Sequence, residues 1–247
     1  MCIRDRDEGE LWFDDSAGQK VLIIGNSHSK DVFNALSASA YAESEYQFAR
    51  KAIRKFEVDD VIEELLLTPN FKEADIVMIA SRYHAEDVEP LQALLSFILE
   101  AGKQPVVLTN IHEFPEYWTR KWTLAEFIGY TLRRESPNVS NEELAATINR
   151  AYFNAVSEHH LAERIDFSGN VNEINRTLAQ LAIEVPGVIV LNRMDYICDT
   201  ESQYCDAVGP DLEKYFYDYG HNTLAGAKKF AENIDRVQWL SPLREQQ

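Results

Sequence analysis

Short apolar runs alternate with helical patterns along most of this chain, and that alternation limits the folds it can adopt. The runs expected to be strands lie at residues 20–25, 46–50, 74–81, 104–110 and 187–192. The first, KVLIIG, is uninterrupted and rich in β-branched residues, which is typical of a strand buried on both faces. Strands joined by crossover helices pair in parallel. The sequence therefore predicts an α/β fold with a mostly parallel five-stranded sheet between two layers of helices.

Helical periodicity fills the intervals between these strands. The expected helices cover residues 28–40, 58–67, 87–101, 119–134, 141–164, 170–184 and 223–236. Since they dominate residues 117–184, we expect a helical insertion packed on one side of the sheet. Nothing in residues 19–240 resembles a linker, so this range is expected to form a single domain. The start, MCIRDR, resembles a translated adapter remnant, and residues 1–18 are expected to be a non-native or disordered tail.

The charge of the chain excludes some partners. Its 247 residues carry a formal net charge of -17, with a pI near 4.7. Nucleic-acid phosphates and anionic lipids are both bound by clustered Lys and Arg, so neither is an expected partner. No stretch approaches the roughly 20 apolar residues of a membrane helix, and no apolar signal segment follows the N-terminus. We expect no membrane span within these residues.

Two cysteines lie close together in YICDTESQYCDAVG, at Cys198 and Cys205. Six residues separate them, which is too wide for a C-x-x-C redox motif. No histidine or second cysteine pair lies nearby to complete a zinc site. The spacing alone allows either a local disulfide or two unrelated thiols. No metal and no cofactor are expected.

The turns that follow the strands are where a site is expected, because ligands of open parallel sheets bind beyond the carboxyl ends of the strands. The first turn reads GNSHS, from Gly25 to Ser29. Its Asn and Ser side chains could simply cap the next helix by accepting from free N–H groups. A phosphate cradle is a second interpretation, although the turn matches neither G-x-G-x-x-G nor G-x-x-x-x-G-K-[ST]. A nucleophilic Ser27 is a third, and it requires a neighbouring base.

Of the six histidines, His221 has the surroundings that a general base needs. Asp218 precedes it by three residues in DYGH, before a helix of small residues. A carboxylate on the same loop can accept from Nδ1, which leaves Nε2 free to take a proton. Taken alone, the motif could also be a turn aspartate beside a surface histidine. His84 and His112, at strand ends, are further candidates, whereas His28 is expected to face away from the serine beside it.

A serine after the first strand and D-x-x-H before the last helix together resemble the SGNH, or GDSL-type, hydrolase superfamily. This resemblance covers about residues 19–236 and implies a flavodoxin-like three-layer fold with Ser27 as nucleophile, Asp218 as orienting acid and His221 as base. GNSHS is most similar to the G-D-S-H form of periplasmic SGNH domains fused to membrane acyltransferases that O-acetylate bacterial surface glycans. ADIVMIASRY, QPVVLTNIHEFPE and the cysteine pair ahead of YFYDYGHNT resemble the same subgroup.

Membership in that subgroup implies further properties. It implies a disulfide between Cys198 and Cys205, a periplasmic or other extracytoplasmic location, and a membrane acyltransferase domain upstream in the natural protein. The partners would be an acyl donor and a carbohydrate acceptor. The family's usual Asp is Asn26 here, and ASRYH replaces its G-x-N-D block, whose Asn donates to the oxyanion. Asn26, Ser81 and Arg82 are therefore the residues expected to bind the oxyanion or the substrate.

The leading hypothesis is O-acyl transfer, in particular of an acetyl group, to or from a carbohydrate hydroxyl through an acyl-enzyme on Ser27. The sequence does not separate transfer from hydrolysis, because both use the same three residues. A second hypothesis is an SGNH-fold domain that binds a glycan or docks a partner and has lost catalysis. A third is a phosphate or nucleotide binder of flavodoxin-like fold. Reactivity of Ser27 distinguishes the first hypothesis from the other two.

Overall fold

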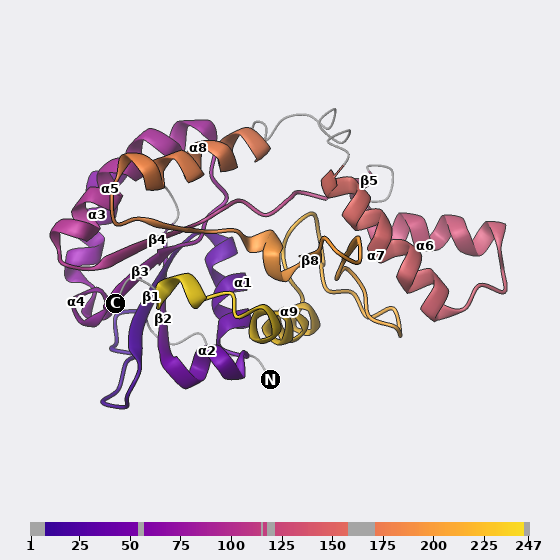
Figure 1. The fold of residues 1–247 in the computed structure, drawn as a ribbon, viewed down its shortest axis with the longest axis horizontal. Helices are drawn as coiled ribbons and strands as arrows, with labels where there is room; N and C mark the ends of the chain where they lie inside the picture. The colour runs from indigo at the N-terminus through magenta and orange to yellow at the C-terminus, as the bar shows by residue number, and fades with distance from the viewer. Residues whose placement is uncertain (1–7, 54–56, 115, 118–121, 158–170, 245–247) are drawn as a thin grey trace.

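Five strands form a single sheet at the centre of the fold, shown in the computed structural model in Figure 1. The structure describes residues 8–53, 57–114, 116–117, 122–157 and 171–244. In order across the sheet the strands are β2 (Tyr46–Ala52), β1 (Gln19–Gly25), β3 (Ile76–Ile79), β4 (Gln104–Leu108) and β7 (Ile189–Leu191). All four neighbouring pairs run parallel. The predicted α/β fold with a mostly parallel five-stranded sheet is confirmed.

Helices cover both faces of the sheet (Figure 1). One layer contains α1 (Ser27–Leu36), α2 (Ala40–Glu45) and α9 (Leu224–Val237). The other contains α3 (Val58–Leu67), α4 (Pro69–Glu73), α5 (Val88–Glu100) and α8 (Val171–Glu184). Along β1, Val21 and Ile23 belong to the core of the first layer, and Leu22 and Ile24 to that of the second. Successive strand residues point to opposite faces, so an uninterrupted apolar strand serves both cores.

The helical insertion is shorter than the sequence predicts. Helices α6 (Leu124–Glu135) and α7 (Asn141–Ser157) pack on each other and extend away from the sheet in Figure 1. Helix α8 is not part of this extension, because its apolar side chains Ile174, Leu178 and Leu181 are buried in the core of the second layer. Parts of the helices expected over residues 119–134, 141–164 and 170–184 lie outside the described residues.

Local capping explains two other differences from the predicted helices. The helix expected over residues 28–40 is divided, because the Ser39 side chain accepts from the N–H of Ala42 and begins α2. The helix expected from residue 119 begins only at Leu124, where Thr123 and Glu126 form a capping box.

The remaining short elements are β5 (Glu116–Tyr117), β6 (Trp122–Thr123), β8 (Cys198–Asp199), β9 (Tyr204–Cys205) and the 3₁₀ helices η1 (Ala85–Asp87), η3 (Arg193–Tyr196) and η4 (Ser241–Leu243).

The described segment before β1, at residues 8–18 within the expected tail, packs on the domain. Phe13 is buried in the core of the second layer, and the N–H of Trp12 donates to Asn70 of α4 at 2.8 Å. Asn70 in turn donates to the Glu10 carbonyl at 2.8 Å. Residues 1–7 lie outside the described part, and a single domain ending at residue 240 stays a prediction. Within the residues described, no helix has the length and apolar character needed to cross a membrane.

Candidate active site

The turns after β1 and β3 meet where the strand order of the sheet reverses, between β1 and β3. This is the place at which open α/β sheets bind ligands. Gly25 makes the close approach possible: its φ is +142°, and a Cβ there would lie 2.0 Å from the carbonyl oxygen of Ala80. Only glycine tolerates both the backbone conformation and the contact.

Asn26 caps α1 and leaves Ser27 as the first residue of the helix. The Asn26 Oδ1 accepts from the N–H of His28 at 3.1 Å. The capping interpretation of GNSHS is therefore correct for Asn26. As the first helical residue, Ser27 has an N–H without a partner inside the helix, at the positive end of the helix dipole.

Ser27, His221 and Asp218 form a continuous chain of hydrogen bonds. The Ser27 Oγ lies 2.8 Å from Nε2 of His221, and the Nδ1 of His221 lies 2.8 Å from Oδ2 of Asp218. The other oxygen of Asp218 accepts from the N–H groups of Gly220 and His221, at 2.9 and 2.8 Å. Thr223 caps α9 directly after this loop. The structure thus brings the three predicted residues together, while their catalytic roles stay a prediction.

Their surroundings set the pKa values of the two titrating groups. Burial opposes a charge on Asp218, but hydrogen bonds from the His221 side chain and from the N–H groups of Gly220 and His221 lower its pKa below the usual value. Burial likewise opposes a charge on His221, yet the hydrogen bond and charge of Asp218, with the charge of Asp31, raise the pKa of His221. The arrangement therefore favours an anionic Asp218 beside an imidazole that is more basic than usual.

The three residues expected to bind the oxyanion or the substrate lie at the adjoining turns after β1 and β3. The N–H of Asn26 donates to Ser81 Oγ at 3.2 Å, and the N–H of Arg82 donates to Asn26 Oδ1 at 3.3 Å. The Arg82 guanidinium donates to both oxygens of Glu113, at 2.6 and 2.8 Å, and lies 5.1 Å from the ring centroid of Tyr219. The hydrogen bonds of Asn26 thus join the turn after β1 to the turn after β3, where Ser81 and Arg82 lie, and Arg82 also contacts the loop that carries His221.

Three polar residues beside Ser27 and His221 were not predicted as part of the site: His28, Asp31 and Arg193. All are buried, with 1%, 5% and 0% of their surface exposed, respectively. The expectation that His28 faces away is wrong, because its ring stacks on that of His221 with centroids 4.6 Å apart. The signal in the sequence was the spacing of Ser27 and Asp31, which places both on one helix face.

Two histidines and an aspartate lie close together beside Ser27, and these residue types can bind a metal ion. Ligand atoms of His28, Asp31 and His221 all lie within 4.8 Å of one another. However, both ring nitrogens of His221 already contact Asp218 and Ser27, and the guanidinium of Arg193 contacts His28. A cationic guanidinium disfavours a second cation, so the residues fit a metal poorly.

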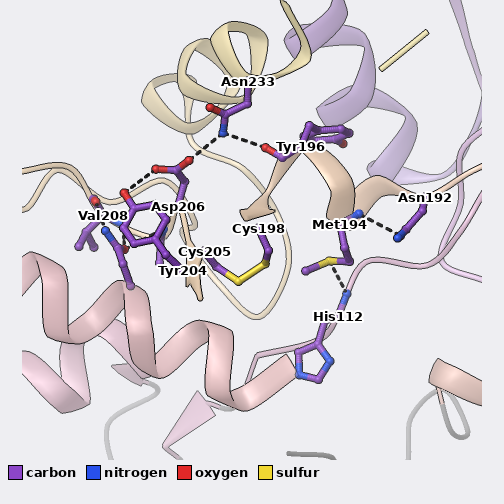
Figure 2. Close-up of a disulfide and its surroundings, with 12 residues drawn as sticks. His112, Asn192, Met194, Tyr196, Cys198, Tyr204, Cys205, Asp206, Val208 and Asn233 are labelled. Atoms are coloured by element: carbon purple, nitrogen blue, oxygen red, sulfur yellow. Dashed lines mark hydrogen bonds between the residues drawn. A yellow bond between two sulfur atoms is a disulfide. The ribbon is translucent and has the colours of Figure 1, made fainter. Parts of the chain in front are cut away.

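The disulfide implied by the resemblance is present between Cys198 and Cys205 and joins β8 to β9 (Figure 2). The next residue, Asp206, accepts from the Tyr204 hydroxyl at 2.8 Å and from Asn233 of α9 at 2.7 Å. As Figure 2 shows, Asn233 also donates to the Tyr196 carbonyl, at 2.8 Å. These contacts fix the hairpin to the helix that follows His221.

Comparison with known families identifies the chain. The sequence model of the SGNH domain fused to AT3 domains matches residues 1–236. The chain belongs to this SGNH domain family. Family membership places it among proteins of acyl transfer or ester hydrolysis in general. No curated protein matches this SGNH domain in sequence.

Solved structures resemble this SGNH domain at low sequence identity. The periplasmic domain of a lipopolysaccharide acetyltransferase from Salmonella ser. Paratyphi A aligns with 11% identity and a TM-score of 0.61, over 90% of this chain and 85% of that one. An acetyl xylan esterase aligns with 10% identity and a TM-score of 0.48, over 88% and 98%. A GDSL-like lipase from Bacteroides thetaiotaomicron aligns with 10% identity and a TM-score of 0.44, over 88% and 86%. The likeness to the Salmonella domain supports the expected SGNH hydrolase fold.

Proposed function

We propose that this SGNH domain transfers an acyl group, in particular acetyl, to or from a carbohydrate hydroxyl through an acyl-enzyme on Ser27. One observation carries the proposal: hydrogen bonds of 2.8 Å join Ser27 to His221 and His221 to Asp218. A serine hydroxyl is a weak nucleophile at neutral pH, and this arrangement supplies the base that activates it.

The proposed reaction has two steps that use the same three residues. First, Ser27 Oγ attacks the acyl carbonyl while His221 Nε2 takes its proton, and the imidazolium then returns that proton to the leaving group. Second, a carbohydrate hydroxyl or water gives its proton to His221 and attacks the acyl-enzyme, and Ser27 regains a proton as the ester breaks. Asp218 holds the imidazole in the required tautomer and stabilises the imidazolium in both steps.

The proposed oxyanion site combines backbone and side-chain donors. The N–H of Ser27 lies at the first turn of α1, where the helix dipole favours developing negative charge. The Arg82 guanidinium is the proposed second donor, because only two of its five N–H groups are used in the bonds to Glu113. Its contact with Tyr219 keeps it next to the His221 loop.

The proposed substrates and location rest on the family and on the bacterial neighbour. SGNH domains of this family are fused to AT3 domains, and the Salmonella neighbour is the periplasmic domain of a lipopolysaccharide acetyltransferase. We therefore propose a surface carbohydrate as acceptor, an upstream acyltransferase domain as partner, and an extracytoplasmic location. The disulfide is consistent with an oxidising compartment.

Covalent labelling tests the proposed nucleophile. A fluorophosphonate probe should attach once to the wild-type protein, and mass spectrometry should show one probe adduct. The control Ser44→Ala, which changes an exposed serine on α2, should give the same adduct. It should add none to Ser27→Ala. Hydrolysis of p-nitrophenyl acetate should follow the same pattern. Equal labelling of Ser27→Ala would contradict the proposed nucleophile. A wild-type protein that is neither labelled nor active would instead leave a glycan-binding or docking role for this domain.

A further inference from the structure

The first turn of α1 presents more than one side chain to His221. Asp31 follows Ser27 by four residues, so the two lie one above the other on the same face of the helix. His28 is the residue after Ser27 in α1. Arg193 of η3 contacts His28. Three buried titratable groups are costly to desolvate, and so their arrangement around His221 calls for a function.

The contact between Arg193 and His28 fixes the protonation of His28. The Nη1 of Arg193 lies 3.3 Å from Nδ1 of His28, and the pair is buried. Since a guanidinium can only donate, Nδ1 must accept and the proton of the neutral ring lies on Nε2. Burial, and then the charge of Arg193, lower the pKa of His28 to about 2. His28 is therefore a neutral ring with one tautomer and one orientation.

That ring packs flat against the proposed base. The planes of His28 and His221 differ by 18°, with their centroids 4.6 Å apart. Stacking of this kind restricts rotation of His221 about its side-chain bonds, and so holds Nε2 in line with Ser27 Oγ.

Asp31 brings a second carboxylate close to His221. One of its oxygens lies within 4.8 Å of a His221 ring nitrogen. The Asp31 carboxylate accepts a hydrogen bond from the backbone N–H of Asn222. Its Oδ2 accepts no hydrogen bond within the described residues. An opposite charge at this distance stabilises a protonated imidazole. Asp218 has the direct hydrogen bond, whereas Asp31 acts only through its charge.

We propose that Asp31, His28 and Arg193 are positioning residues for His221. Asp31 adds a second negative charge that stabilises the imidazolium formed when Ser27 is deprotonated, and the Arg193–His28 pair holds the ring plane. This inference rests on the proposed function, because it assigns these residues to the same proton transfer.

The charge balance around His221 decides the sign of the expected effect. Asp218, Tyr217 and Tyr219 face it from its own loop, His28 and Asp31 from α1, and Arg193 from η3. Arg82 lies beyond Tyr219. Among these, the two carboxylates favour the protonated ring and Arg193 opposes it. Removing the charge of Asp31 should therefore lower the pKa of His221.

The first experiment follows the His221 imidazole by NMR as a function of pH. The pKa of His221 should fall in Asp31→Asn, and remain unchanged in Asp31→Glu and in the control Asp60→Asn, which removes an exposed charge from α3 on the other face of the sheet. The His221 signal is assigned from its absence in His221→Gln. An unchanged pKa in a folded Asp31→Asn would overturn the proposal.

A measurement on the wild-type protein covers the case in which Asp31→Asn does not fold. The carboxyl carbon of Asp31 should titrate near pH 6, because burial raises the pKa of this group to about 6, and the His221 signal should shift in the same step. An Asp31 that titrates near the ordinary 3.8 without moving His221 would also overturn the proposal.

Kinetics then separate a positioning role from a structural one. In Asp31→Asn we expect kcat/KM for p-nitrophenyl acetate to fall about tenfold, and its acid limb to move to lower pH, as a less basic His221 requires. A loss with no movement of the limb would mean that Asp31 only supports the fold. The NMR readout needs no turnover, so a failure of the proposed function stays distinguishable from a failure of this inference.

Discussion

Ser27 Oγ and His221 Nε2 lie 2.8 Å apart, although the two residues are 194 positions apart in the sequence. Ser27 begins α1, His221 lies on the loop that leads into α9, and these two helices pack directly against each other. The contact therefore depends on the packing of two rigid helices, which is the support that a catalytic geometry requires.

Asp218→Asn should reduce kcat by about 10³–10⁴-fold. The amide can still accept from the N–H groups of Gly220 and His221, so the loop should keep its shape. It can also present a donor to Nδ1, which would select the wrong tautomer of His221. The kinetics of p-nitrophenyl acetate hydrolysis measure the effect. Asp199→Asn is the matched control, because Asp199 is a half-buried aspartate that also accepts from backbone N–H groups. Activity of Asp218→Asn equal to that of this control would refute the role.

Arg82→Met should reduce kcat by about 10²-fold and leave KM nearly unchanged, because an oxyanion donor acts only in the transition state. The methionine keeps an unbranched apolar stem next to Tyr219 but has no N–H donor. Steady-state kinetics of both parameters give the test. A higher KM with an unchanged kcat would instead assign Arg82 to substrate binding.

Stability should fall as the pH drops below about 6.5, and His28 is the cause. The pKa of His28 is about 2 in the folded protein and 6.5 when unfolded, so within this window only the unfolded chain binds the proton. Asp31 acts in the opposite sense between 3.8 and about 6, where the folded protein binds the extra proton. Since each group accounts for one proton, the two effects largely cancel between pH 3.8 and about 6, and the fall due to His28 is expected from about pH 6.5 to 6 and again below 3.8.

Urea denaturation at several pH values across this window measures that dependence. His28→Gln keeps an acceptor for Arg193 and removes the His28 titration. Between pH 3.8 and about 6 its free energy of unfolding should therefore rise as the pH falls, because only Asp31 then acts, whereas that of the wild-type protein should stay nearly level. The same slope in both proteins would show that another group is responsible.

Gly25→Ala should destabilise the protein far more than Gly102→Ala. Both glycines have positive φ, but a Cβ at Gly102 would meet no heavy atom within 4 Å, whereas one at Gly25 would lie 2.0 Å from the Ala80 carbonyl oxygen. We expect a loss of about 1 kcal/mol at Gly102 from backbone conformation alone, and of at least about 3 kcal/mol at Gly25. Urea denaturation of both variants measures the two losses of unfolding free energy. Equal losses would contradict the close approach of Gly25 to Ala80.

Loss of the disulfide should lower the free energy of unfolding by about 2–3 kcal/mol, because the cross-link closes a short loop in the unfolded chain. The double variant Cys198→Ala, Cys205→Ala should match the reduced wild-type protein in chemical denaturation, and reductant should not affect it. Since Asp206 still binds Asn233 of α9, kcat should change little. A large loss of kcat in a folded variant would mean that the disulfide itself supports the His221 loop.

Much of the fold follows from patterns that extend over only a few residues. KVLIIG is apolar on both strand faces, so its burial on both sides can be read without knowing its neighbours. Asp218 and His221 share one loop, and their pairing is likewise local. Ser27 could be linked to them from the sequence only because the resemblance supplied the long-range connection. The packing of residues 8–18 and of α8 could not be predicted from the sequence, because each depends on apolar contacts with distant segments.

The sequence by itself determined the parallel α/β sheet, the capped turn that exposes Ser27 and the local pair of Asp218 and His221. Only the tertiary structure decided what surrounds them. Arg193 and His28 are 165 residues apart, and the two become partners only because η3 and α1 enclose them away from water. Burial sets the protonation of such groups, and burial is a property of the packed molecule that no short pattern contains.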